Sequence, residues 1–309
     1  MSGAGPSVSC NTLENDMGYQ SVFRNGLFVG QVAIVTGGGS GIGRCTAHEL
    51  ASLGAIVAIV GRDPDKLETV KAEIEDEGGV VSTHVCDIRE EAQVVATVEA
   101  VIAQHGRIDA LINNAGGQYR QALEEISTKG FEAVVRNNLT GGFIFMREVY
   151  NRWMKEHRGS IVNIIADMWN GWPAYAHSGA ARAGMWNLTE SAASEWAPAG
   201  VRINAVAVGG VASSGFDTYT SEAQKEILKF PTKIPLQRYG TVSEISGAIV
   251  YLLSPVAAYI TGTCIRVDGG GPNARFCYTD LTYHQNSEPF NGFHLDEPPR
   301  LLTEGPKKD

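Results

Sequence analysis

The sequence has no apolar run that approaches the roughly 18 residues needed for a membrane-spanning helix. It contains no HExxH, HxxxH or CxxC pair, the spacings that typically hold metals or redox-active thiols. Basic residues are outnumbered, with 25 Lys and Arg against 34 Asp and Glu, and they form no block that would follow a phosphate backbone. We therefore predict no membrane partner, no metal centre and no nucleic-acid partner.

Cysteines are few, odd in number and widely scattered along the chain. This usage favours free thiols in a reducing compartment over a disulfide framework. The polar first twenty residues do not have the pattern of a secretory signal, and the final GPKKD is not a peroxisomal address of the SKL type. We expect a cytoplasmic protein.

The chain of 309 residues has the composition of a globular domain, with 43% hydrophobic and 19% charged residues. Seven short runs rich in Val and Ile alternate with segments of helical periodicity: QVAIVTG, AIVAIVG, GVVSTHV, IDALINN, GSIVNII, VRINAVA and TCIRVDG. Continuous apolar strands separated by helices indicate a parallel sheet covered on both faces. We predict a single-domain α/β fold, a Rossmann-type doubly wound sheet of seven strands, with ligands bound beyond the carboxyl ends of the strands.

Three segments lie outside this alternation. Residues 1–28 are polar and aperiodic, and we expect an arm that is flexible or laid over a neighbouring subunit. Within the expected core domain, residues 29–271, the alternation is interrupted at about 212–236, a candidate lid over the substrate that we call the lid segment. The tail, residues 272–309, is aromatic and rich in Pro, so we expect it to pack on the body or on another subunit.

A glycine-rich turn, TGGGSGIG, runs from Thr36 to Gly43 between the first strand and the first helix. Glycines let the backbone approach a pyrophosphate, and the helix N-terminus offers unpaired N–H groups to its charge. The placement between strand and helix indicates a dinucleotide site. Further along the chain, Thr241 and Glu244 have the spacing of a capping box at the start of a helix.

The spacing Gly37-x-x-x-Gly41-x-Gly43 resembles that of the short-chain dehydrogenase/reductase family, as do the NNAG at residues 113–116, Asn138 in NNLTG and Asp87 in CDI. The resemblance covers about residues 30–271. It implies a nicotinamide dinucleotide held by Gly37, Gly39, Ser40, Gly41, Ile42, Gly43, Gly61, Arg62, Asp87, Ile88, Asn114, Ala115, Gly116, Arg182, Gly209, Val211 and Ser213.

The second strand ends in Gly61-Arg62 rather than in an acidic residue. An acid at this position binds the ribose hydroxyls of NAD, whereas an Arg can pair with the 2′-phosphate of NADP. We therefore predict NADP(H) as the cofactor. The alternative is that Arg62 is a solvated surface charge, and the neighbouring Asp63 is the reason to keep it open.

The family's catalytic Ser, Tyr and Lys are missing, because their positions hold Ile165 or Ala166, Ser178 and Arg182. Of the four expected catalytic residues only Asn138 is kept, and Arg182 stays charged and cannot relay a proton. The body also resembles the peroxisomal trans-2-enoyl-CoA reductases, which have a Ser and an Arg at the same two places. The resemblance implies that the tyrosine that acts as the acid in those reductases corresponds to Trp186 here.

The loop after the fifth strand, ADMWNGWPAY, brings a carboxylate and three aromatic side chains to the predicted site: Asp167, Trp169, Trp172 and Tyr175. A carboxylate there would stabilise a cationic substrate, and indole rings offer faces for stacking. Tyr119 is a further candidate for the pocket. The ordinary alternatives are that Asp167 caps a helix or pairs with Arg182, and that the tryptophans belong to the core or a subunit interface.

This loop, with the missing tetrad, resembles the fungal reductase/Diels–Alderases of prenylated indole alkaloid biosynthesis. The resemblance implies an NADPH-dependent reductase of a cationic, aromatic iminium substrate, with an intramolecular [4+2] cycloaddition as a further step. We assign catalysis to Asp167, Arg182 and Asn138, and substrate contacts to Trp169, Trp172, Tyr175, Ser178, Tyr119 and Trp186. The alternatives are a trans-2-enoyl-CoA reductase and a non-catalytic NADP-binding protein.

The helices that begin near Gly141 and Ser178 are rich in the apolar residues that this family uses for subunit packing. We therefore expect a homotetramer.

Overall fold

The computed structural model describes residues 18–274, 281 and 283–306, together with the backbone but not the side chain of Thr218. Seven strands form one sheet in the order β3-β2-β1-β4-β5-β6-β7, and every adjacent pair is parallel. Their bounds are β1 Val32–Thr36, β2 Ile56–Gly61, β3 Val80–Val85, β4 Ala110–Asn113, β5 Gly159–Ala166, β6 Val201–Val208 and β7 Cys264–Val267. The predicted seven-stranded, doubly wound sheet is thus confirmed.

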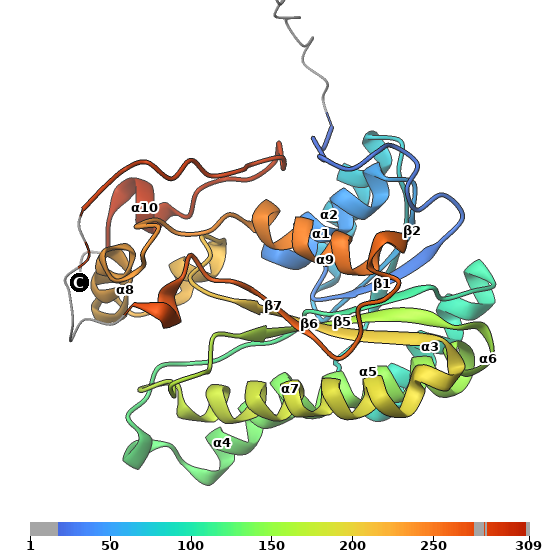
Figure 1. Cartoon of the computed structure of the whole chain (residues 1–309), viewed down its shortest axis with the longest axis horizontal. Coiled ribbons are helices and arrows are strands. Elements are labelled where there is room, and N and C mark those ends of the chain that lie inside the picture. The colour runs from blue at the N-terminus through green and yellow to red at the C-terminus, as the bar shows by residue number, and fades with distance from the viewer. Residues whose placement is uncertain (1–17, 275–280, 282, 307–309) are drawn as a thin grey trace, which may run out of the picture.

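Helices cover both faces of the sheet (Figure 1). On one face lie α1 (Gly41–Ser52), α2 (Pro64–Asp76) and α9 (Val242–Leu253). On the other lie α3 (Glu91–His105), α5 (Gly141–Val149) and α7 (Ala176–Trp196). The remaining α-helices of the described chain are α4 (Thr128–Val135), α6 (Lys155–His157), α8 (Ser221–Lys229) and α10 (Arg300–Glu304).

The central strands are mainly apolar and buried, as both of their faces are covered by helices. All five residues of β1 are buried, and Ile161 to Ala166 of β5 are buried without interruption. Strands of a sheet covered on one face alternate apolar and polar residues, whereas strands covered on both faces have longer apolar runs. The predicted capping box also forms: the Thr241 hydroxyl accepts from the Glu244 N–H, and the Glu244 carboxylate accepts from the Thr241 N–H.

The polar network beneath the site joins four elements. Asn113 of β4 donates to the Asn163 side chain of β5 at 2.9 Å and to the Gly142 carbonyl of α5 at 3.2 Å. Asn163 in turn donates to the Thr189 hydroxyl of α7 at 2.9 Å. These buried amides are satisfied, as buried polar groups must be. They fix the relative positions of the strands and helices that form the site.

The arm and the tail pack on their own chain where they are described. Tyr19 and Phe28 are buried, so residues 18–28, the described end of the predicted arm, pack on the body of their own chain. In the tail, Phe293 and Leu301 are buried in the same way. Aromatic and aliphatic burial of this kind contributes about 1.5–3 kcal/mol per side chain.

None of the described helices has the length and apolar character required to cross a membrane. In the described part of the chain, no group of three or more His, Cys, Asp or Glu residues could hold a metal ion.

Candidate active site

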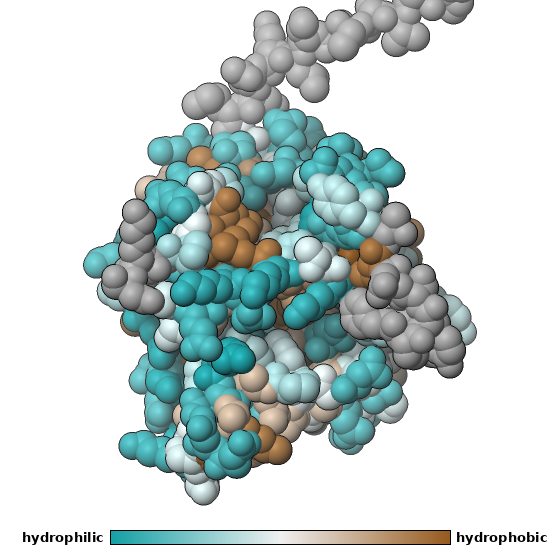
Figure 2. Space-filling view, turned by 90° about the vertical axis from the view of Figure 1, so that its left-hand side faces the viewer, coloured by the Kyte–Doolittle hydropathy of each residue, from teal (hydrophilic) through white to brown (hydrophobic). Residues whose placement is uncertain are grey.

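A cleft of about 450 Å³ opens at the carboxyl ends of β1, β2 and β4. Thirteen of the predicted cofactor residues line it together: Gly37, Gly39, Ser40, Gly41, Ile42, Gly61, Arg62, Asp87, Ile88, Asn114, Ala115, Gly116 and Ser213. Gly43, Gly209, Val211 and Arg182 are not in its lining. Figure 2 looks onto this end of the molecule, whose surface is mainly hydrophilic and hollowed near its centre.

The glycines of the first turn are needed for its shape. Gly37 and Gly41 have φ values of 69° and 52°, a region that residues with side chains rarely adopt. A Cβ on Gly43 would lie 2.2 Å from the Gly37 carbonyl oxygen. The turn therefore folds tightly onto the start of α1, whose N–H groups and dipole suit a pyrophosphate.

Thr36 and Asn114 connect this turn to β4. The Thr36 hydroxyl accepts from the backbone N–H groups of Asn114 and Ala115, both at 3.0 Å. The Asn114 side chain donates to the Thr36 carbonyl at 2.9 Å. The NNAG segment is thus fixed against the glycine-rich turn, and both line the cleft.

Two cations stand at the end of the cleft next to β2. Arg62 and Lys66 both line it and are exposed. Asp63, the reason to keep the alternative open, also lines the cleft. Its carboxylate caps α2 by accepting from the N–H groups of Asp65 and Lys66, and it lies 4.0 Å from the Lys66 ammonium. Lys66 lies four residues after Arg62, in the first turn of α2. The helix expected directly after the second strand could have indicated that Lys66 faces the cleft beside Arg62.

Asp87 was expected to bind the dinucleotide. Its carboxylate is held by the Arg89 guanidinium, with the Arg89 Nε at 2.9 Å. Hydrogen bonds from Arg89 are the main reason that the pKa of Asp87 falls to about 2. Asp87 therefore stays ionised on the wall of the cleft.

Asn138 lies in a π-helical turn, Arg136–Thr140, between α4 and α5. Its amide donates to the Gly117 carbonyl at 2.8 Å and accepts from the Gly117 N–H at 3.0 Å. Such π-turns are frequent at functional sites, where the added residue redirects a side chain. Here the buried Asn138 fixes the segment that follows NNAG.

The positions of the missing phenol and ammonium are occupied without forming a proton relay. Ser178 is buried and donates to the Gln118 side chain at 2.6 Å, a partner that sequence reasoning missed. The Arg182 guanidinium donates to the Ile164 carbonyl at 2.6 Å and lies against Gly116 on the cleft wall. Burial lowers the pKa of Arg182 only to about 10, so it remains a cation at neutral pH.

Asp167 directly follows β5, and its N–H donates to the Val208 carbonyl of β6 at 3.1 Å. Among the described residues its carboxylate has no hydrogen bond or ion pair, so it neither caps a helix nor pairs with Arg182. Burial raises the pKa of Asp167, and the negative charge of Asp268 raises it further, while Arg266 opposes this. The group is a half-buried carboxyl that favours the protonated form more than an ordinary aspartate does.

The aromatic residues of the loop have different surroundings. The Arg266 guanidinium lies 5.3 Å over the Trp169 ring, so one face of this indole already holds a cation of the protein. Trp172 packs against Tyr175 with ring centroids 5.2 Å apart. Burial raises the pKa of Tyr175 to about 12, with a further contribution from the nearby Tyr219 of the lid segment.

Tyr119 and Trp186 are less directly placed for substrate. The Tyr119 ring meets the buried His177 edge to face at 4.5 Å, and its hydroxyl lies against Gly130 of α4. Trp186, on α7, packs against the hydrophobic core. Four residues were absent from the sequence-based set: Lys66 in the cleft lining, Gln118 at Ser178, Tyr219 near Tyr175 and Asp268 near Asp167.

Residues 37–271 match the family described as enoyl-(acyl carrier protein) reductase. A probable 2,4-dienoyl-CoA reductase of Bacillus subtilis is 35% identical, over 78% of this chain and 96% of that protein. The solved citronellol catabolism dehydrogenase of Pseudomonas aeruginosa PAO1 is 54% identical, covers 82% of this chain and 99% of its own, and superposes with a TM-score of 0.74. A variant actinorhodin polyketide ketoreductase, solved with NADPH, is 30% identical over 79% of this chain and 97% of its own, with a TM-score of 0.75.

The chain belongs to the short-chain dehydrogenase/reductase family of oxidoreductases. It is therefore an enzyme of the nicotinamide-dependent reductase class, and the dienoyl-CoA reductases are among its relatives.

Proposed function

We propose that the protein is an NADPH-dependent reductase of a carbon–carbon double bond conjugated to a thioester carbonyl. The observation that carries this proposal is Asp167, a carboxyl with a raised pKa and no hydrogen-bond partner among the described residues, at the carboxyl end of β5. In a site without the usual phenol it is the group suited to deliver a proton.

The residues present fit the dinucleotide. The glycine turn leaves room for the pyrophosphate, and Arg62 and Lys66 supply positive charge for a 2′-phosphate. When bound, NADPH supplies the hydride that adds to the far carbon of the conjugated double bond. Arg182, a permanent cation against Gly116, is suited to bind the nicotinamide ribose.

The proton balance of the reaction is provided by the chain itself. Addition of hydride leaves an enolate on the thioester, and protonated Asp167 donates to its α-carbon and becomes a carboxylate. Asp167 is only half-buried, so solvent can return the proton for the next turnover. Such a sequence does not need the phenol of the family's ketone reductases, because the acceptor is carbon instead of an alkoxide oxygen.

The relatives support this substrate class. The family match is described as an enoyl reductase, and several relatives are 2,4-dienoyl-CoA reductases. The relative solved with NADPH supports the cofactor.

The experiment is a panel in which the purified protein oxidises NADPH with an enoyl-CoA, a 2,4-dienoyl-CoA, a cyclic iminium ion or a ketone. We expect turnover with one of the two thioesters and little with the ketone. Preference for the ketone, or inactivity of both thioesters with NADPH bound, would contradict the proposal.

A second candidate is reduction of a cyclic iminium in an indole alkaloid, with an intramolecular [4+2] cycloaddition. The observation in its favour is the pair Trp172 and Tyr175, packed together in the loop that also carries Asp167. In this case Asp167 acts as a carboxylate that stabilises the cation. Turnover of the iminium above either thioester in the same panel would select it.

A further inference from the structure

The described end of the tail runs across the molecule from the lid segment to α1 and α2, and then returns to the lid segment (Figure 1). We call residues 283–306 the strap. The family match ends at residue 271, so the strap lies outside it. The strap contacts the body at Phe293, the end of the lid segment around Arg238, and the lid segment again at Asp217. At the second place the His284 ring also donates to the Pro235 carbonyl of the lid segment at 2.8 Å.

The strap is anchored on the body by Phe293. Its ring stacks on Tyr19 at 5.8 Å and meets His48 at 4.9 Å, with the Arg44 guanidinium 5.2 Å from its centroid. Its N–H donates to the Ser243 hydroxyl at 3.1 Å. With only 3% of its surface exposed, Phe293 fixes the far end of the strap.

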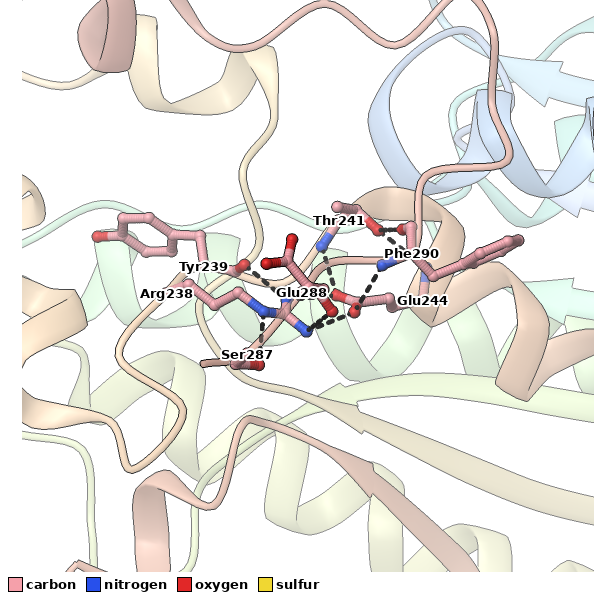
Figure 3. Close-up of polar contacts among 7 residues, drawn as sticks. All are labelled: Arg238, Tyr239, Thr241, Glu244, Ser287, Glu288 and Phe290. Atoms are coloured by element: carbon pink, nitrogen blue, oxygen red, sulfur yellow. Dashed lines mark hydrogen bonds and ion pairs between the residues drawn. The ribbon is translucent and has the colours of Figure 1, made fainter. Parts of the chain in front are cut away.

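A second anchor lies just after the lid segment, at Arg238 (Figure 3). The Arg238 guanidinium forms two bonds to the Glu244 carboxylate, at 2.8 and 2.6 Å, and a third to the Ser287 hydroxyl at 2.9 Å. Glu244 also accepts from the Phe290 N–H, and Thr241 donates to the Phe290 carbonyl. The strap, the start of α9 and the chain next to the lid segment thus share one network.

The third contact is with the lid segment itself. The Asp217 carboxylate accepts from the N–H of Arg300 at 3.1 Å and from the N–H of Leu301 at 2.9 Å, at the start of α10. The Leu301 side chain is fully buried. A carboxylate that caps two N–H groups makes a strong, directional contact.

The position of Asp217 connects the strap to the site. Ser213, Ser214 and Gly215, which precede Asp217, line the cofactor cleft. Tyr219, which follows it, lies close enough to Tyr175 to raise the pKa of that phenol. We propose that the strap holds the lid segment closed over the cofactor and the mouth of the substrate site, through the contact of Asp217 with α10. Asp217 is thus a positioning residue, and the strap sets how fast the cofactor leaves.

The contact can be broken from either side with a matched control. Asp217→Ala removes the acceptor. Arg300→Pro removes one donor at the first position of α10, where proline is tolerated, whereas Arg300→Ala removes the side chain and keeps the N–H. We expect the NADPH dissociation rate, measured by stopped-flow fluorescence, to rise about tenfold in Asp217→Ala and less in Arg300→Pro, equivalent to up to about 1.4 kcal/mol. Arg300→Ala should match the wild type.

The double variant Asp217→Ala/Arg300→Pro should be no faster than Asp217→Ala alone, because both changes break one contact. Equal dissociation rates in the wild type and Asp217→Ala would overturn the proposal, as would additive effects of the two substitutions in the double variant.

The inference rests on the cofactor part of the proposed function. A second measurement, limited proteolysis, does not depend on cofactor binding. Trypsin should cut at Lys225 and Lys229 of the lid segment faster in Asp217→Ala without cofactor. Unchanged cleavage would count against the strap even if NADPH does not bind.

Discussion

At the scale of single residues, Arg62 and Lys66 line the cleft next to β2, and we propose that their charges select NADPH over NADH. We predict that Arg62→Ala and Lys66→Ala each weaken NADPH binding roughly tenfold, because each removes one charged hydrogen-bond donor from the 2′-phosphate. NADH binding should change little. Titration of both cofactors measures this, with Lys71→Ala as the control, since Lys71 lies on α2 outside the cleft. Tighter binding of NADH than of NADPH by the wild type would refute the prediction.

The sequence located Asp167 and the replacement of the phenol, because both follow from positions relative to family motifs. It did not predict the surroundings that decide their chemistry. Ser178 bonds to Gln118, sixty residues away, and Arg182 bonds to a main-chain carbonyl of β5. Asp268, which helps raise the pKa of Asp167, lies after a different strand. Such pairings depend on the fold and leave no local pattern.

At the scale of elements, the start of α1 has no room for an added side chain at Gly43, while α9 has room for one at Gly247. Gly43→Ala would place a Cβ 2.2 Å from the Gly37 carbonyl, so we predict loss of cofactor binding and destabilisation by about 1–3 kcal/mol. Gly247, within α9, has nothing within 4 Å of its added Cβ. Gly247→Ala should stabilise the protein by about 0.5–1 kcal/mol. Urea unfolding and NADPH titration test the pair, and the opposite order of stability would show that the turn is less tight than described.

The strands and the capped helices were predictable because their signals are local: apolar runs for strands such as β5, and Thr241 with Glu244 for α9. The tail was not predictable in the same way. Its contacts, such as Phe293 on Tyr19, join residues more than 270 positions apart and have no periodicity. The sequence indicated only that aromatic residues of the tail would pack, and Phe276 and Tyr278 lie outside the described residues.

At the scale of the whole molecule, we predict a homotetramer of about 130 kDa, four times the chain mass of 33.1 kDa. The apolar side chains of α4 and α5 that remain exposed, such as Phe131 and Phe143, support packing between copies. Light scattering on the purified protein measures the mass directly. A single species with the mass of one chain would rule the tetramer out.

The central claim is that protonated Asp167 delivers the proton in a thioester reduction, and the pH dependence of kcat tests it most directly. The acid must be protonated to act, and its pKa is raised from 3.8 by burial and by Asp268. We therefore predict that kcat with the preferred thioester falls as pH rises through this raised pKa. In Asp167→Asn the fall should disappear and kcat should drop by about 10² or more. A kcat that instead rises with pH through the same range, or an Asp167→Asn variant with the activity and profile of the wild type, would contradict the account.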